Sequence, residues 1–258
     1  MGGSIIGIAL FFIVILHMIY KKIKNKKFDL LLLVILLLTI IMSYPVLCFL
    51  ELGQIAYPVD IENTRPIAKI SLPINKPTVV GWGGNSIETN YPHAVVPMER
   101  WAYDLLISPY SINDKNLQSY GIYGEEIICP ANGYIVGTYD EEDDNVLGTE
   151  NNRSMVGNYI YLKLEDTGTY LIFAHLKKGS ILVKEGEYIK EGEPMAKVGN
   201  SGLSSEPHLH IHHQRQNPKT TSIFLTEGLP LYFRNINGPA MPKGGVKGEI
   251  ISPLNNKY

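Results

Sequence analysis

Two uninterrupted apolar runs open the chain, and each predicts a long helix. The first extends over residues 4–20 and the second over residues 30–50. A helix needs about 20 apolar residues to cross the hydrocarbon core of a membrane, with roughly 17 as the lower limit. Both runs meet this requirement, so residues 1–52 are predicted to form a membrane anchor of two transmembrane helices.

The segment between the two runs, residues 21–29, contains five lysines. Because loops rich in Lys and Arg stay in the cytoplasm, this loop is expected inside the cell and residues 53–258 outside. The chain is therefore predicted to be a multi-pass protein of the cell membrane with an extracytoplasmic domain. A cleaved signal peptide is the rival interpretation, but the first run lacks a preceding basic segment and a small-residue cleavage site.

After the second apolar run, the pattern changes to short strands. Residues 158–164 alternate between the two faces of a strand, and residues 169–176 form a second apolar strand after the turn-forming segment Glu165–Gly168. Two such runs around a short turn predict a β-hairpin. No long helical period follows residue 50. Many closely spaced short strands favour an all-β antiparallel fold, a sandwich or a barrel-like sheet.

Composition narrows the functional classes. The formal net charge of the 258 residues is −2, which gives no reason to expect a nucleic acid as partner. The two cysteines, Cys48 and Cys129, are far apart and neither belongs to a CxxC pair. A disulfide framework is therefore not expected.

The most informative segment is His208–His213, which holds four of the seven histidines. Successive side chains of a strand point to opposite faces, so His208, His210 and His212 are expected on one face. Imidazoles two residues apart on a strand can converge on one ion, and imidazole suits zinc. A catalytic zinc usually takes three protein ligands, so this segment alone does not complete a site.

Two further histidines can contribute. His93 lies eleven residues before Asp104, and His175 closes an apolar strand. A lone histidine is more often a surface or hydrogen-bonded core residue, but the combination predicts a metal site. His212 is interpreted as a supporting residue or a bystander, and His213 is expected at the surface.

The segment 170–213, with Gly-Asn-Ser-Gly before His-Leu-His, resembles the lysostaphin and LytM-type zinc endopeptidases that cut peptidoglycan. The segment Tyr123–Val136 resembles their strand-turn-strand element, and the likeness covers roughly residues 91–213. The resemblance implies an antiparallel β fold of the duplicated hybrid motif type with one Zn²⁺ per chain in a groove. It also implies a peptidoglycan peptide as substrate, in a cross-bridge or in a stem peptide.

The resemblance also assigns roles to residues. It implies His93, Asp104 and His210 as metal ligands, and His175 and His208 as catalytic residues. One departure is visible, because most members have a histidine four residues before the aspartate, where this chain has Arg100. The first ligand must therefore come from a longer loop, where His93 is the only histidine nearby, or be lost.

The chemistry leaves two questions open. The chain has no His-Glu-x-x-His motif, so no helical glutamate is placed as a base and a histidine must accept the proton. Which of His175 and His208 is acid and which is base stays open. The alternative function is a catalytically degenerate module of the same fold that binds the cell wall or regulates other enzymes. The distance of His93 from the other ligands separates the two.

Overall fold

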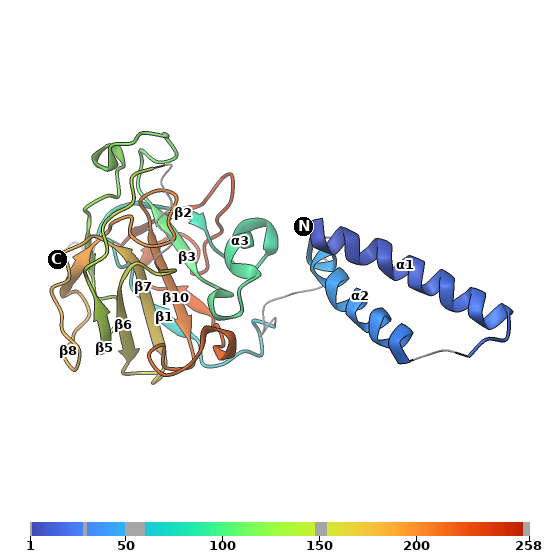
Figure 1. The fold of residues 1–258 in the computed structure, drawn as a ribbon. Coiled ribbons are helices and arrows are strands. Elements are labelled where there is room, and N and C mark those ends of the chain that lie inside the picture. The colour runs from blue at the N-terminus through green and yellow to red at the C-terminus, as the bar shows by residue number, and fades with distance from the viewer. Residues whose placement is uncertain (1, 28–29, 50–59, 148–153, 255–258) are drawn as a thin grey trace. The chain divides into compact units, whose positions relative to one another are not determined.

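The computed structural model describes residues 2–27, 30–49, 60–147 and 154–254, and the chain divides into two compact units, Met1–Ile55 and Ala56–Tyr258. The first unit is a pair of helices, α1 (Gly2–Ile23) and α2 (Leu30–Phe49) (Figure 1). The two helices approach closely at Gly7, where an added Cβ would lie 2.8 Å from Cβ of Met42.

The prediction of two transmembrane helices is confirmed only in part. Among the described residues, the segment Ile5–Ile23 is long and apolar enough to cross a membrane, as judged by length and composition, whereas the apolar part of α2, Leu30–Tyr44, is shorter. The end of the predicted second span lies outside the residues whose side chains the structure describes. An apolar helix near the N-terminus fits a membrane anchor or a signal sequence, so multi-pass insertion is not established.

The second unit is built on one large antiparallel sheet, as the sequence predicts. Its nine strands follow the order β12-β13-β2-β3-β10-β7-β6-β5-β8, and all neighbours in it are antiparallel. Two small sheets accompany it, the antiparallel pair β4–β9 and the parallel pair β1–β11. The strands are β1 (Ala68–Ile70), β2 (Thr78–Trp82), β3 (Tyr103–Leu106), β4 (Glu126–Ile128), β5 (Gly133–Tyr139), β6 (Asn158–Leu164), β7 (Tyr170–Leu176), β8 (Tyr188–Ile189), β9 (Pro194–Lys197), β10 (Leu209–Gln214), β11 (Leu231–Phe233), β12 (Ile236–Asn237) and β13 (Ile250–Pro253).

The predicted hairpin is the pair β6–β7, with Ile160 opposite Phe173. Strand β10, which carries the histidine cluster, lies between β3 and β7 near the middle of the sheet (Figure 1). Its register places His210 opposite Asp104 on β3 and opposite Ala174 on β7. Two candidate site residues are therefore direct cross-strand neighbours.

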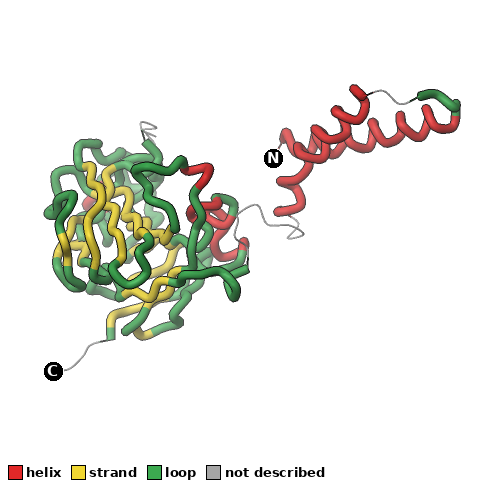
Figure 2. Tube along the Cα trace, turned by 90° about the horizontal axis from the view of Figure 1, so that it is seen from below, coloured by secondary structure: helices red, strands yellow, loops and turns green. Residues whose placement is uncertain are grey.

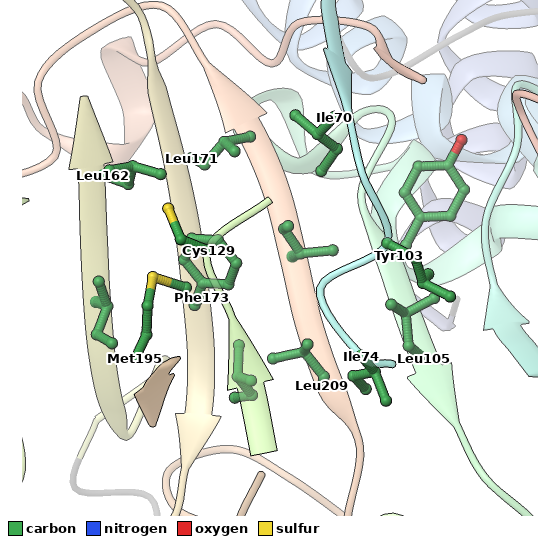
Figure 3. Packing of buried hydrophobic residues seen from close by; sticks show 14 of the residues in the cluster. Ile70, Ile74, Tyr103, Leu105, Cys129, Leu162, Leu171, Phe173, Met195 and Leu209 are labelled. Atoms are coloured by element: carbon green, nitrogen blue, oxygen red, sulfur yellow. The ribbon is translucent and has the colours of Figure 1, made fainter. Parts of the chain in front are cut away.

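The hydrophobic core lies against one face of the large sheet. Figure 3 shows Leu162, Phe173 and Leu209 projecting from neighbouring strands, with Met195 of β9 and Ile70 of β1 packed near them. The two small sheets thus complete a sandwich-like arrangement on this face. The opposite face of β10 carries the alternate residues, which leaves it available for the polar side chains of the site.

Short helical segments lie at the margin of the strands (Figure 2). The one that matters for the site is α3 (Ile87–Ala94), inserted between β2 and β3. Its N-cap Ser86 accepts a hydrogen bond from the backbone N–H of Thr89, and the helix is kinked at Asn90, two residues before Pro92. Three turns of 3₁₀-helix are η1 (Pro97–Glu99), η2 (Leu117–Ser119) and η3 (Ile223–Leu225).

Candidate metal centre and its cavity

The fold brings all five side chains that the sequence singles out to one place. His93 comes from α3, Asp104 from β3, His175 from β7, His210 from β10 and His208 from the position just before β10. Directly opposed residues on neighbouring strands have their side chains on the same face, which explains why Asp104 and His210 meet.

One carboxylate oxygen is the point of convergence. Oδ1 of Asp104 lies 3.0 Å from Nδ1 of His210 and 3.3 Å from Nε2 of His93. Nε2 of His208 is 3.6 Å from the same oxygen. The ring of His175 lies beside that of His208, with 4.7 Å between ring centroids. Three imidazole nitrogens thus surround one carboxylate oxygen.

His93 reaches this point because Asn90 holds α3 and the imidazole together. The amide nitrogen of Asn90 donates to the backbone carbonyls of Gly84 and Ala102, which flank the helix. Its oxygen therefore accepts from Nδ1–H of His93, at 2.8 Å. A neutral imidazole carries one N–H, so Nε2 of His93 presents a lone pair to Asp104.

Arg100, at the position where the resemblance leads one to expect a histidine, takes no part in the convergence. Its Nη2 donates to the backbone carbonyl and the side-chain oxygen of Asn85, and the residue is 1% exposed. Burial lowers the pKa of its guanidinium to about 10, so the group remains a cation at neutral pH. A cation cannot ligate zinc, and α3 supplies an imidazole instead.

The two candidate catalytic histidines are held in the same way. Nδ1–H of His175 donates to the backbone carbonyl of Ser201, and Nδ1–H of His208 to that of Glu206, each at 2.8 Å. A carbonyl oxygen only accepts hydrogen bonds, so the neutral form of each ring has its lone pair on Nε2. His175 also has a positive φ of 60°, an uncommon backbone conformation for a residue with a side chain.

The electrostatics of the cluster favour an ionised Asp104 carboxylate and a neutral His175. Burial alone would lower the pKa of His210, but its bond to Asp104 and the charge of Glu99 outweigh burial and raise that pKa. Burial alone would raise the pKa of Asp104, but His93, His208 and His210 outweigh it and hold that pKa well below the usual value. Burial lowers the pKa of His175 well below its usual value, and the neighbouring His208 and His210 lower it further. His175 is therefore neutral at neutral pH.

His212 contacts the candidate ligand His210, whereas His213 lies away from the metal centre. Nε2 of His210 lies 2.9 Å from Nδ1 of His212, so His212 supports a candidate ligand from behind. The expectation that His213 lies at the surface is wrong, because it is 1% exposed. Strand β10 is central in the sheet and covered on both sides, and His213 bonds Pro230 and Thr169.

Glu99 is a site residue that sequence reasoning missed. It closes the 3₁₀ turn η1, is 8% exposed and places Oε1 3.9 Å from Nε2 of His210. Nothing in the local pattern separates it from an ordinary surface glutamate. Only the fold around Pro97–Arg100 turns it inward.

The five residues line a cavity of about 360 Å³. A second cavity of about 310 Å³ adjoins it, and the two share Trp82, Asp104, Ser205 and His208 in their walls. An elongated substrate could therefore cross the cluster from one cavity to the other.

The donor set fits zinc. Two zinc bonds of about 2.0–2.1 Å at a tetrahedral angle separate the donor atoms by about 3.3–3.4 Å, close to the 3.0 and 3.3 Å seen from Asp104 to His210 and His93. A second set, His93, Glu99 and His210, has donor atoms within 4.8 Å of one another. Its Glu99–His210 distance of 3.9 Å is longer, and Nε2 of His210 already contacts His212. The two sets share His93 and His210 and differ in the carboxylate, and the distances from Asp104 to the two rings are the shorter ones.

Comparison with known proteins shows a family resemblance in the part of the chain that holds three of the site histidines. Residues 120–221 match the model of Peptidase family M23. This segment is similar to peptidase family M23. The matched segment contains His175, His208 and His210, whereas Asp104 and His93 precede it. M23 peptidases depend on zinc, in agreement with the donor set.

A curated relative is the peptidoglycan DD-endopeptidase ShyC of Vibrio cholerae serotype O1, 31% identical over 91 residues. The match covers 33% of this chain and 20% of that relative. Among solved structures, lysostaphin from Staphylococcus simulans is 20% identical, with 60% of this chain and 47% of that chain covered and a TM-score of 0.37. A zinc-containing peptidase from Vibrio cholerae is 18% identical, with 62% and 36% covered and a TM-score of 0.33. These two structural similarities are too weak to indicate a function, which is inferred below from the geometry of the site.

Proposed function

We propose that this chain is a zinc-dependent endopeptidase that hydrolyses peptide bonds in peptidoglycan. The observation that carries the proposal is the convergence of His93 Nε2 and His210 Nδ1 on Asp104 Oδ1, at 3.3 and 3.0 Å. Two imidazoles and one carboxylate form a three-residue ligand set of the kind that catalytic zinc sites use. These three residues would hold the ion.

The chemistry divides between the metal and the histidines. When bound, zinc supplies Lewis acidity, which makes water more acidic and stabilises negative charge on the carbonyl oxygen of the scissile bond. His175 and His208 present bare Nε2 atoms beside the ligand cluster and are fixed by their bonds to the carbonyls of Ser201 and Glu206. One of them would accept a proton from water at Nε2, and that same proton would go on to the leaving amine, either from this ring or after transfer through the other.

The substrate class is supported by the relative of known name, a peptidoglycan DD-endopeptidase. The two adjoining cavities give an extended peptide room on both sides of the cluster. The bond that is cut lies in a cross-bridge or in a stem peptide of peptidoglycan, and both are peptide chains that such a groove accommodates.

The alternative is a degenerate module that binds the wall or regulates other enzymes. It requires that a ligand be missing, and the presence of Arg100 at the usual ligand position raises that alternative. The 3.3 Å distance from His93 to Asp104 favours the enzyme, because α3 supplies the imidazole from elsewhere in the chain.

The proposed location is the outer side of the cell membrane. Helices α1 and α2 would anchor the chain in the lipid bilayer, with the lysine-rich loop between them in the cytoplasm. Residues 53–258 would then face the wall, where peptidoglycan lies.

The test is incubation of the purified full-length chain, in detergent, with isolated peptidoglycan. We expect about one zinc per chain and soluble muropeptides whose masses identify the broken bond. A chelator should stop the reaction and added zinc should restore it. A chain that carries zinc but releases no fragment would contradict the peptidase and favour the degenerate module.

A further inference from the structure

The face of β10 that carries His210 continues with two buried polar side chains, His212 and Gln214. The three side chains form a row in which Nε2 of His210 is 2.9 Å from Nδ1 of His212, and Nε2 of His212 is 3.0 Å from Oε1 of Gln214. They are 5%, 2% and 2% exposed, so water does not compete for these bonds. The row leads away from the metal centre along the strand.

The direction of every hydrogen bond in the row follows from its far end. The amide nitrogen of Gln214 donates to the backbone carbonyl of Gln216 at 2.7 Å. Because a carbonyl only accepts, the amide has its NH₂ toward Gln216 and its oxygen toward His212. An amide oxygen only accepts as well, so Nε2 of His212 carries the hydrogen of that bond.

The tautomer of His212 determines which ring nitrogen of His210 carries a hydrogen. A neutral His212 with its hydrogen on Nε2 has a lone pair on Nδ1, and that lone pair accepts from Nε2–H of His210. Glu99 is the other acceptor near this nitrogen, but at 3.9 Å it is beyond hydrogen-bond range. Nε2 of His210 therefore carries a hydrogen. Its Nδ1 lies 3.0 Å from the carboxylate oxygen of Asp104, which accepts a hydrogen from that nitrogen when no metal is bound. A bound metal ion would take the place of that hydrogen and leave Nδ1 as the bare nitrogen.

We propose that His212 and Gln214 are positioning residues that fix His210 in its Nε2–H tautomer, so that the lone pair of Nδ1 faces Asp104 and the metal. The inference rests on the metal site proposed above. A ligand imidazole that is orientated through its second nitrogen is a recurring feature of zinc sites. Asn90 does the same for His93 in one step, through an amide that is likewise fixed by backbone carbonyls.

The test compares two substitutions of His212 in the full-length chain in detergent, with the dissociation constant for zinc measured by competition with a chelator. His212→Leu removes the acceptor, and we expect zinc binding about 10–100-fold weaker. His212→Asn places an amide oxygen near the position of Nδ1 and should recover most of the affinity. Gln214→Met should give a smaller loss, because His212 is then free to take either tautomer.

The matched control is Ile172→Val. Ile172 lies opposite His212 on β7 and is 1% exposed, so this change disturbs the packing beside the row without altering a polar group. It should leave zinc affinity unchanged. ¹⁵N–¹H correlation spectra of the histidine rings should show the hydrogen of His210 on Nε2 in the zinc-loaded wild-type chain.

The inference is overturned if His212→Leu binds zinc as tightly as the wild type, or if His212→Asn binds it as weakly as His212→Leu. A loss in Ile172→Val as large as that in His212→Leu would also overturn it, because packing would then explain the effect. A spectrum with the hydrogen of His210 on Nδ1 has the same consequence. Failure of the wild-type chain to bind zinc would instead contradict the proposed function itself.

Discussion

Oδ1 of Asp104 has three imidazole nitrogens within 3.6 Å, and the residues that carry them separate into two groups. The rings of His93 and His210 are supported through their second nitrogens by buried side chains, Asn90 and His212. His175 and His208, which line the cavity, are supported by the backbone carbonyls of Ser201 and Glu206. Support through one ring nitrogen suits a metal ligand and a proton-transfer group alike. His93 and His210 are assigned as the ligands because their nitrogens lie nearest to Oδ1 of Asp104, at 3.3 and 3.0 Å.

This division predicts two kinds of variant. His93→Ala and His210→Ala should lose zinc and activity together, since a three-ligand site depends on each ligand. His175→Ala and His208→Ala should keep the zinc and lose about 10²–10⁴-fold in turnover, the usual share of a general acid or base. Metal analysis beside peptidoglycan hydrolysis measures both. Retention of stoichiometric zinc by His93→Ala would place the upstream ligand elsewhere.

Alternation along a strand predicts correctly that His208, His210 and His212 share a face, because that rule is local. Burial is not local. His213 is buried, and Glu99 turns into the cavity, because strands and turns distant in sequence cover them. The sequence therefore indicates which residues can meet, while the depth of each depends on packing.

The burial of His213 predicts a dependence of stability on pH. Burial lowers the pKa of His213 to about 4, from about 6.5 in an unfolded chain. Between these values the unfolded state binds more protons, so the stabilisation is complete above pH 6.5 and is lost as the pH falls through 6.5 to about 4. The loss from this residue amounts to about 3 kcal/mol.

Urea unfolding of metal-free residues 56–258 at a series of pH values measures this effect. His175 and His212, whose pKa values are also lowered by burial, add to it, whereas His210, whose pKa is raised by its bond to Asp104, opposes it. His213→Asn keeps a donor for the carbonyl of Pro230 but cannot titrate, so its stability should fall less steeply with acid. A curve parallel to that of the wild type would contradict the buried, neutral state of His213.

At the scale of elements, regular strands are easier to predict than the insertion that completes the site. The hairpin β6–β7 follows from alternation around a turn. Helix α3 is only eight residues long and contains Pro92, so the sequence shows no helical period that would predict it. His93 was indicated by the resemblance, but the kink at Asn90 that directs its ring is a tertiary feature.

Gly157 packs closely against the backbone of Ser201, the residue whose carbonyl holds the ring of His175. Gly157 has a φ of +63°, and a Cβ on it would lie 2.4 Å from the backbone of Ser201, whose carbonyl binds His175. Gly157→Ala should therefore push this loop away, lower stability by more than about 1 kcal/mol and reduce turnover. Thermal unfolding and hydrolysis of peptidoglycan measure the two effects.

Gly168→Ala is the matched control. Gly168 has a similar φ of +69°, in the turn between β6 and β7, but nothing lies within 4 Å of its added Cβ. It should carry only the backbone strain, about 1 kcal/mol, with turnover unchanged. Equal effects of the two substitutions on turnover would contradict the role assigned to the Gly157 contact.

At the scale of the whole molecule, the division into Met1–Ile55 and Ala56–Tyr258 follows the change in composition along the chain. Long apolar runs and period-two strands are distinct patterns, so this division is predictable from sequence. The number of membrane spans is less secure, because the described apolar part of α2, Leu30–Tyr44, falls short of the usual length.

The proposed orientation predicts where a protease can act. With the lysine-rich loop in the cytoplasm, protease added to intact cells stripped of their wall should remove residues 60–258. Loss of the second unit is measured with an antibody to the C-terminal part of the chain. A cytoplasmic protein serves as the control for lysis. Survival of the second unit until the cells are lysed would contradict the orientation.

If α3 supplies the ligand that Arg100 cannot, His93 must be bonded to the ion in a crystal structure of the zinc-loaded second unit. Anomalous scattering at the zinc edge locates the ion without reference to the protein. We expect one peak at about 2.0–2.2 Å from His93 Nε2, Asp104 Oδ1 and His210 Nδ1. A peak bonded to Glu99 and Nε2 of His210, or one that His93 does not reach, would contradict it.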